Sequence, residues 1–303
     1  AAALYNFGNA VFSAAGDTRK PLYILIAAGI LNVVLNLFFV IVCHLAEAGV
    51  ALASAISQWL SAGLVLFFLH RVHDSYGLNL RNAHFHASKV RLILPLGLSA
   101  AAQNAIFATA NLFIQSGVNT FDAVIVEGTA AAANADSLVY DVMAAIYTAC
   151  SSFMSQNYGA GKRKRVLHSY LVAMGYSLGI GLIFGISLAL FGRGFLRIFA
   201  TDADVIEAGL VRLQLMGFCY GFSAFMDCTI AASRGLGKSI IPTIIVILGS
   251  CVFRVAWVYT IFAYFNTIMS LYLVYIFSWT LTAIAEIIYF IHIYRGIAKR
   301  LGA

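Results

Sequence analysis

Long apolar stretches separated by short polar connections dominate the chain. Segments such as 21–43 and 166–191 run for about twenty residues with at most one charge, which is the length an α-helix needs to cross about 30 Å of hydrocarbon. A β-barrel would instead show strands of about ten residues with alternating polarity, and this alternation does not occur. The pattern predicts an all-α polytopic membrane protein with nine spanning helices, at 1–16, 21–43, 47–70, 91–117, 126–157, 166–191, 204–232, 240–264 and 268–294.

The composition agrees with a lipid environment. Hydrophobic residues make up 62% of the chain and charged residues 10%, whereas a soluble domain has about 25% charged residues. The five cysteines lie in apolar stretches without a CxxC pair, so we expect small buried side chains and neither disulfides nor a cofactor site. The chain starts at Ala1 with neither an initiator Met nor a signal peptide, which leads us to expect a longer protein.

Basic residues gather in alternate connections. Fifteen of the nineteen Lys and Arg residues fall on one side of the predicted topology, and only Arg193 and Arg197 lie in connections on the other. The positive-inside rule places the basic side and the C-terminus in the cytoplasm, with Ala1 outside. The net charge of +7 therefore indicates contact with anionic lipid headgroups and not with nucleic acid.

A weak internal repeat suggests how the spans are organised. The stretches 16–21 and 237–242 share a Gly-to-Pro spacing, lie in predicted cytoplasmic turns and are 221 residues apart. A proline that opens a helix after a turn is common, so the spacing alone does not establish a repeat. The offset predicts three further helices ahead of the chain and a twelve-helix protein. Residues 1–70 would complete a first six-helix lobe, 71–90 would be a cytoplasmic linker, and 91–303 would form the second lobe.

Two motifs suggest a nucleotide site and a metal site, but the sequence around each of them does not support that function. The run ending in Gly237, Lys238 and Ser239 resembles a phosphate-binding loop, but Ala232 stands where the first glycine is required and a membrane helix replaces the strand. The linker histidines have no carboxylate or thiolate neighbours in sequence, which favours a solvated linker over a metal site. These histidines are His70, His73, His84 and His86.

Polar side chains inside the spans are the candidate functional residues, because a charge at the bilayer centre costs about 2.5–3.5 kcal/mol. In the span 126–157 several recur at intervals of three, four or seven residues and predict a wall that faces a water-filled cavity. The main residues on this face are Asn134, Ser137, Asp141 and Thr148. Hydrogen bonds between packed helices are the alternative role for the hydroxyls. Asp136 is turned by about 140° from Asp141, so the two carboxylates need not share one task.

A second group of polar residues lies in other spans. Asp227 and Arg254 are in consecutive antiparallel spans, which predicts a buried ion pair that is either structural or functional. Neutral hydrogen-bonding side chains occur in the second and fourth spans, and helix packing explains them as well as a cavity does. These are Asn32, Asn36, Gln103 and Asn111.

Several short motifs together resemble the multidrug and toxic compound extrusion (MATE) family over essentially the whole chain. They are GDTRKP at 16–21, NVVLN at 32–36, GVALASAISQ at 49–58, SQNYGAGK at 155–162 and SRGLG at 233–237. The resemblance implies a twelve-helix, two-lobed, inverted-V antiporter whose helices 4 to 12 are present here. It also implies export of organic, often cationic, drugs or metabolites through a cavity between the lobes, in exchange for H⁺ or Na⁺.

The chain departs from the family pattern at sites that bear on the coupling ion. Ser13 stands where members usually carry Arg, and the span 91–117 offers only amides where the sodium-coupled branch carries an acid. The tenth-helix acid of that branch aligns near Ser223, about a turn before Asp227. We nevertheless expect Asp136, Asp141 and Asp227 to carry the coupling ion and Arg254 to hold or release Asp227.

Two other readings lead to different expectations. A lipid-linked oligosaccharide flippase of the same superfamily needs a more basic cavity, for which Arg254 alone is thin support. A membrane-embedded enzyme needs catalytic groups clustered at one depth, and the histidines in the spans are too few and too scattered. We expect a non-enzymatic monomer in a bacterial inner membrane, with small organic molecules and lipids as its partners.

Overall fold

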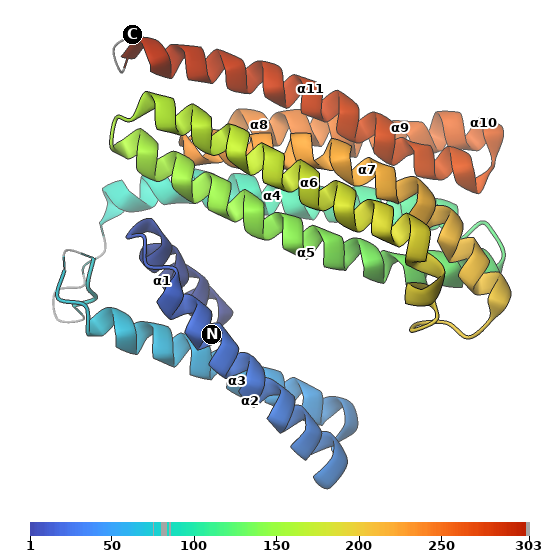
Figure 1. The fold of residues 1–303 in the computed structure, drawn as a ribbon, viewed down its shortest axis with the longest axis horizontal. Helices are drawn as coiled ribbons and strands as arrows, with labels where there is room; N and C mark the ends of the chain where they lie inside the picture. Colours follow the sequence, from blue (N-terminus) through green and yellow to red (C-terminus); the bar gives the residue numbers. More distant parts are fainter. Residues whose placement is uncertain (75, 80–83, 85, 301–303) are drawn as a thin grey trace. The chain divides into compact units, whose positions relative to one another are not determined.

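The computed structural model describes residues 1–74, 76–79, 84 and 86–300 (Figure 1). Part of the predicted linker, including Arg81, lies outside the described residues, as do the side chains of Lys299 and Arg300. The chain divides into two compact units, Ala1–Ala87 and Ser88–Ala303.

The described part of the first unit contains three spanning helices. They are α1 (Ala2–Ala14), α2 (Arg19–Leu37), which ends in one π-helical turn, η1 (Phe38–Val42), and α3 (Ala46–His70). Both α1 and α2 pack against α3, and their small core includes Phe12, Ile24 and Val65. The Tyr5 hydroxyl donates a hydrogen bond of 3.1 Å to the Pro21 carbonyl and so ties α1 to the start of α2.

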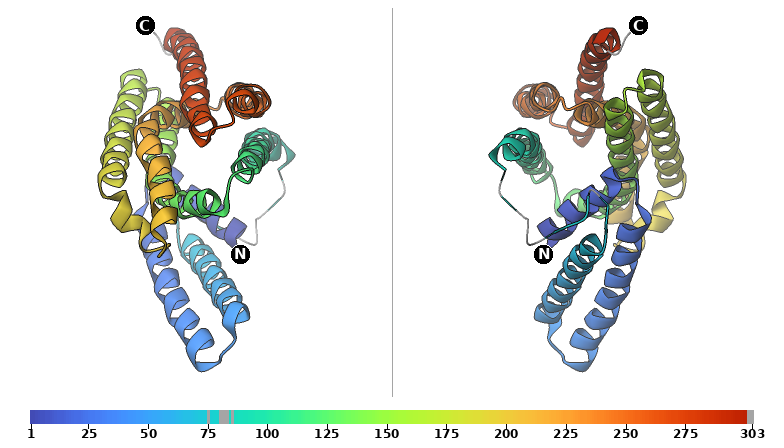
Figure 2. Two further views of the ribbon diagram at one scale, coloured as in Figure 1. Left: turned by 90° about the vertical axis from the view of Figure 1, so that its right-hand side faces the viewer. Right: turned by 90° about the vertical axis from the view of Figure 1, so that its left-hand side faces the viewer.

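The described part of the second unit contains six spans. Four are α4 (Ala87–Val118), α5 (Ala123–Gly159), α6 (Arg163–Leu196) and α7 (Ala203–Gly235). The fifth is interrupted by two π-helical turns and consists of α8 (Ile240–Val246), η3 (Ile247–Val252), α9 (Phe253–Trp257), η4 (Val258–Phe262) and α10 (Ala263–Phe265). The last is α11 (Ile268–Arg300). Figure 2 shows these spans as one bundle with α6 at its outer edge.

The prediction of an all-α membrane protein is confirmed for the described part of the chain. Eight helices there are long and apolar enough to cross a membrane, and α1 covers the short first span. Most of the helices extend a few residues beyond the predicted bounds, and α4 begins at Ala87 instead of Arg91. The reason is that hydropathy marks the apolar part of a span, whereas backbone hydrogen bonding continues into polar residues at its ends.

Helix α7 is the most buried span and packs against α5, α6 and α11. Two pairs of glycines allow the close approach. A Cβ added at Gly185 of α6 would lie 2.0 Å from the Gly217 carbonyl oxygen of α7, and one at Gly128 of α5 would lie 2.7 Å from the Gly209 nitrogen. Small residues at such crossings bring helix backbones together where lipid provides no hydrophobic driving force. These contacts fix how α7 is rotated against α5 and α6.

Three helix ends share one turn geometry. Gly16, Gly161 and Gly237 all have positive φ, and each follows the last turn of its helix. In each case the glycine N–H donates to the carbonyl three residues back, and the next N–H donates to the carbonyl five residues before it, as in Asp17 to Phe12 and Lys238 to Ser233. These are Schellman motifs, in which glycine avoids the steric cost of the left-handed conformation.

The internal repeat has further structural support. The 221-residue offset between Gly16 and Gly237 places the end of α1 on the end of α7 at Gly235, and the start of α2 on Ile240, where α8 begins. The same offset brings η1 to within one residue of η4. The π-helical turn is therefore a repeated feature of the second and eighth predicted spans.

Candidate functional site

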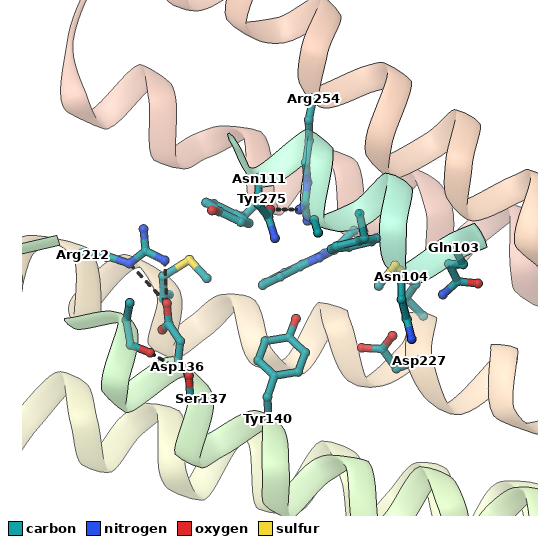
Figure 3. A pocket seen from close by; sticks show the side chains of 16 residues that line it. Gln103, Asn104, Asn111, Asp136, Ser137, Tyr140, Arg212, Asp227, Arg254 and Tyr275 are labelled. Atoms are coloured by element: carbon teal, nitrogen blue, oxygen red, sulfur yellow. Dashed lines mark hydrogen bonds and ion pairs between the residues drawn. The ribbon is translucent and has the colours of Figure 1, made fainter. Parts of the chain in front are cut away.

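A cavity of about 550 Å³ lies within the second unit, among α4, α5, α7, α9 and α11 (Figure 3). This volume is in the range of small-molecule sites in proteins. Its wall combines four charged side chains with amides, aromatic rings and methionines. The lining residues are Gln103, Asn104, Phe107, Ala108, Asn111, Ala133, Asp136, Ser137, Tyr140, Arg212, Met216, Met226, Asp227, Arg254, Tyr275 and Trp279.

Six of the predicted site residues meet in this cavity, namely Gln103, Asn111, Asp136, Ser137, Asp227 and Arg254. The remaining five lie elsewhere. Asn134 lines a separate pocket with Glu127 and Arg197, while Asp141 and Thr148 are exposed on α5 and lie outside the cavity. Asn32 and Asn36 belong to the first unit, where the Asn36 amide donates to the Asn32 side-chain oxygen at 2.9 Å.

The predicted polar face of α5 is therefore split. Ser137 and Thr148 donate to the carbonyls of Ala133 and Ala144, four residues earlier on the same helix. These hydroxyls are satisfied by their own backbone and bridge no neighbouring helix in these bonds. Of the predicted wall only Ser137 lines the cavity, because Asp141 and Thr148 share its helix face but lie about one and three turns further along α5.

The Asp136 carboxylate has a hydrogen-bond donor on both of its oxygens. Arg212 of α7 donates to its Oδ2 from Nη2 at 2.6 Å and from Nε at 3.2 Å, and the Tyr220 hydroxyl donates to Oδ1. The guanidinium of Arg212 also lies over the rings of Tyr272 and Tyr275, at 5.3 and 5.6 Å. Both carboxylate oxygens are thus occupied, which joins α5 to α7 and leaves Asp136 little freedom to bind a solute.

Arg254 is held differently, within a cage of aromatic rings. Its guanidinium lies 4.6 Å from the ring centre of Phe107 and 4.8 Å from that of Tyr275, with Trp279 at 5.9 Å. Nη1 donates to Asn111 at 2.9 Å and Nε to Ser278 at 3.3 Å, while Nη2 has no hydrogen-bond partner. Ring faces and neutral acceptors, and no carboxylate, stabilise this buried cation in the described structure.

The predicted ion pair between Asp227 and Arg254 is wrong for this conformation. Among the described residues neither side chain has a salt-bridge partner within 4.0 Å, although both line the cavity and interact electrostatically. Asp227 Oδ2 is buried without a hydrogen-bond partner, and Figure 3 shows the carboxylate near Asn104 with no bond drawn to Arg254. The prediction relied on the long Arg254 side chain to bridge about 8 Å of difference in depth, but in the structure Phe107, Tyr275 and Asn111 hold its guanidinium instead.

Sequence reasoning gave no site role to several of the contributing residues. Arg212 lies inside a predicted span but is not among the predicted site residues, and the rings of Tyr140, Tyr275 and Trp279 lie in apolar stretches, where aromatic residues usually serve helix packing. Glu286 of α11 was overlooked, although it is fully buried. An acidic residue in the middle of a predicted span was the signal that could have identified it.

No cluster of three or more His, Cys, Asp or Glu side chains suited to a metal occurs in the part of the chain that the structure describes. The cavity instead offers two carboxylates, two guanidiniums and several amides on facing helices. Such a polar enclosure inside a bundle of membrane-spanning helices is typical of a protein that passes solutes across the bilayer.

Comparison with known proteins places the chain in a family. The family profile described as MatE matches residues 95–260. The probable multidrug resistance protein YpnP of Bacillus subtilis is 29% identical over 219 residues, which cover 72% of this chain and 48% of that protein. A protein of Shewanella oneidensis described as an FAD transporter is 28% identical over 222 residues, covering 71% and 48%. The chain thus spans about half the length of these curated relatives.

The solved structures agree on the fold. An outward-facing multidrug resistance MATE family transporter of the MOP superfamily superposes with a TM-score of 0.89 at 20% identity, over 97% of this chain and 66% of that one. Fold and sequence together therefore define an all-α, multi-span membrane protein. The chain belongs to the MatE family, as the resemblance in its short motifs predicted.

Proposed function

We propose that this chain forms part of a secondary active exporter that moves small organic molecules out of the cell in exchange for H⁺ or Na⁺. The observation that carries the proposal is Asp227, a carboxylate with a buried and unbonded oxygen in the wall of the cavity. A carboxylate in such a position is a binding site for a cation that enters the cavity. Family membership and the relatives' names support the transport class.

Ion binding at Asp227 would bias the conformation through Arg254. With its charge neutralised by a proton or sodium ion, Asp227 exerts no pull on Arg254, which rests in its aromatic cage. When the ion leaves, the bare carboxylate attracts the free Nη2 of Arg254, and the two helices are drawn toward a different packing. Asp136 does not take part in this exchange, because Arg212 and Tyr220 occupy it.

The lining also bears on the substrate class. Two carboxylates and two guanidiniums balance in formal charge, which favours an exporter of organic cations or zwitterions over a flippase with a strongly basic cavity. One observation favours a second candidate. Arg254 presents an unbonded Nη2, and the relative described as an FAD transporter covers 71% of this chain, so export of aromatic anions is the alternative substrate class.

Transport in proteoliposomes containing the full-length protein tests the proposal. Asp227→Asn should insert and bind substrate normally but lose export driven by a pH or sodium gradient, and the companion change Arg254→Gln should not restore it. Parallel assays with a cationic dye and with FAD separate the two substrate classes. Gradient-driven export by Asp227→Asn at the wild-type rate would contradict the coupling role of Asp227.

The setting of the exporter is part of the same proposal. The bacterial relatives support a bacterial inner membrane, and the basic connections support a cytoplasmic C-terminus. A single chain of the full-length protein is proposed to suffice for transport. Protease accessibility of a C-terminal tag in inside-out and right-side-out vesicles tests the orientation, and the mass of the detergent-solubilised particle tests the monomer.

A further inference from the structure

Glu286 lies on the buried face of α11, two helical turns from Trp279 of the cavity wall. Its exposed fraction is 0%, and neither carboxylate oxygen has a hydrogen-bond partner. It also lacks an ion-pair partner within 4.0 Å among the described residues. A bare carboxylate anion is strongly disfavoured in such a place, because nothing replaces its lost hydration. In this conformation Glu286 is therefore the neutral acid and carries a proton.

The groups around Glu286 come from a few elements. Helix α7 contributes Asp227 and Arg234, which interact electrostatically with it. Helix α8 carries no titratable side chain, and η3 carries Cys251. On α11 itself Tyr289 interacts with the carboxyl group. Beyond Tyr289 a smaller cavity of about 280 Å³ is lined by residues that include Lys238, Tyr289 and His292.

Arg234 is the basic group that interacts electrostatically with Glu286, and no hydrogen bond joins the two side chains among the described contacts. Its Nη2 donates to Gln103 of α4 at 2.7 Å, and its buried Nε has no partner. Asp227 and Arg234 are seven residues apart on α7, so both lie on one face of that helix. A buried acid without a hydrogen-bond partner among the described residues lies within electrostatic range of a partly buried base whose Nε is free. The two point to a second arrangement in which they meet.

We propose that Glu286 is a second proton-binding site of the exporter and that Arg234 controls it by exchanging Gln103 for the Glu286 carboxylate. The proposal rests on the proposed function. In the exchange the Glu286 O–H bond breaks, its proton passes to water, and the carboxylate left behind is neutralised by the guanidinium of Arg234. The reverse step takes a proton from water and returns Arg234 to Gln103.

The position of the group supplies a route for that proton. Arg234 is the last residue but one of α7, and the turn that follows exposes Gly237 and Lys238. Lys238 also lines the smaller cavity, whose wall reaches Tyr289, three residues beyond Glu286 on α11. In the proposal, Glu286 releases its proton past Tyr289 to water at this turn, and the proton does not cross the main cavity. The predicted topology puts this turn on the cytoplasmic side.

A purely structural Glu286 would behave differently. A carboxylic acid that stays protonated through the whole cycle acts only as a packing group, and glutamine, of the same shape and neutral, would replace it without effect on proton exchange. The two readings therefore differ in the number of protons that the protein exchanges for each solute molecule, and this number can be measured.

The experiment uses the full-length protein in proteoliposomes with a trapped pH indicator. We expect Glu286→Gln to fold and to bind solute as the wild type does, but to move one proton fewer for each solute molecule exported. Arg234→Gln should cause the same deficit, because protonated Glu286 then has no partner to displace its proton. Glu207→Gln is the control. Glu207 is an exposed acid on α7, the helix that carries Arg234, and it is paired with Arg193. Its proton count should equal that of the wild type.

An infrared measurement keeps the proposal testable if transport of the variants is weak. In purified protein without solute, the carbonyl stretch of protonated carboxylic acids should lose intensity in Glu286→Gln and not in Glu207→Gln. An unchanged proton count, or a protonated-acid band that Glu286→Gln does not reduce, would overturn the proposal and leave the exporter function standing. Wild-type protein that exports no solute on either gradient would instead refute the proposed function.

Discussion

Arg212 and Asp136 are 76 residues apart in sequence and form an ion pair across the α5–α7 contact, with Nη2 and Oδ2 2.6 Å apart. Their side chains are only 9% and 13% exposed. Tyr220 completes the hydrogen bonding of the carboxylate. The ion pair neutralises one charge on α5 and one on α7. It also holds α7 in one rotation against α5, and Asp227 lies on the same helix.

Breaking this pair from one side should be costly. We expect Asp136→Asn to lower the free energy of unfolding by about 3–5 kcal/mol, because a buried guanidinium then lacks its anion. The double change Asp136→Asn with Arg212→Gln should cost less than the sum of the single changes. Unfolding of the purified full-length protein in detergent measures all three. Glu207→Gln, which breaks the exposed pair with Arg193, is the control and should change stability by less than about 1 kcal/mol. Additive effects at Asp136 and Arg212 would argue against a coupled pair.

The glycine crossing between α6 and α7 gives a sharper stability test. Gly185→Ala should destabilise the protein by about 1–3 kcal/mol, because the new methyl group would collide with the Gly217 carbonyl oxygen. Gly179→Ala on the same helix meets no atom within 4 Å, so it should be neutral or slightly stabilising through helix propensity. Thermal unfolding of both variants measures the difference. Equal melting temperatures would show that α6 and α7 do not cross at Gly185.

Thiol labelling should separate the two sides of α5. In a full-length protein whose native cysteines are replaced, Ser137→Cys should react with a water-soluble thiol reagent, since Ser137 lines the cavity. Leu138→Cys should not react, because Leu138 is an exposed apolar side chain outside the cavity, where lipid is expected. Transported solute should slow labelling at position 137. Reaction at both positions, or at neither, would contradict the assignment of the cavity wall.

The turn before α2 should show a modest pH dependence. A hydrogen bond from the Lys20 ammonium, 2.9 Å away, lowers the pKa of the Asp17 carboxyl from its ordinary value. A carboxyl group with a lowered folded-state pKa adds stability above its unfolded pKa, and this stability is lost as the pH falls through the folded value. Asp17→Asn should therefore melt slightly below the wild type at pH 7 and together with it in strong acid. The pair is exposed, so the difference should be small and should shrink in salt. A gap between the two proteins that persists in strong acid would assign the effect to something other than this ionisation.

The sequence by itself determined the membrane spans and the turns between them. Hydropathy belongs to each segment alone, so spans such as 166–191 could be located without knowing their neighbours, and glycines such as Gly237 mark turns through their own backbone freedom. The family resemblance followed from the same local motifs. Among the candidate site residues, an intramembrane charge such as Asp227 was recognisable because lipid penalises it wherever it points.

Only the tertiary structure decided which of those charges meet. The rise along a helix gives the depth of a residue, and the predicted pair of Asp227 and Arg254 relied on a long side chain to bridge a difference in depth of about 8 Å. Partnership also requires that both helices turn the side chains toward each other, and this rotation is set by packing between helices far apart in sequence, as at Gly185 and Gly217. Helix packing therefore pairs Asp136 with Arg212 and surrounds the Arg254 guanidinium with aromatic rings. The same packing buried Glu286 without a hydrogen-bond partner among the described residues, which its place inside a predicted span could not show.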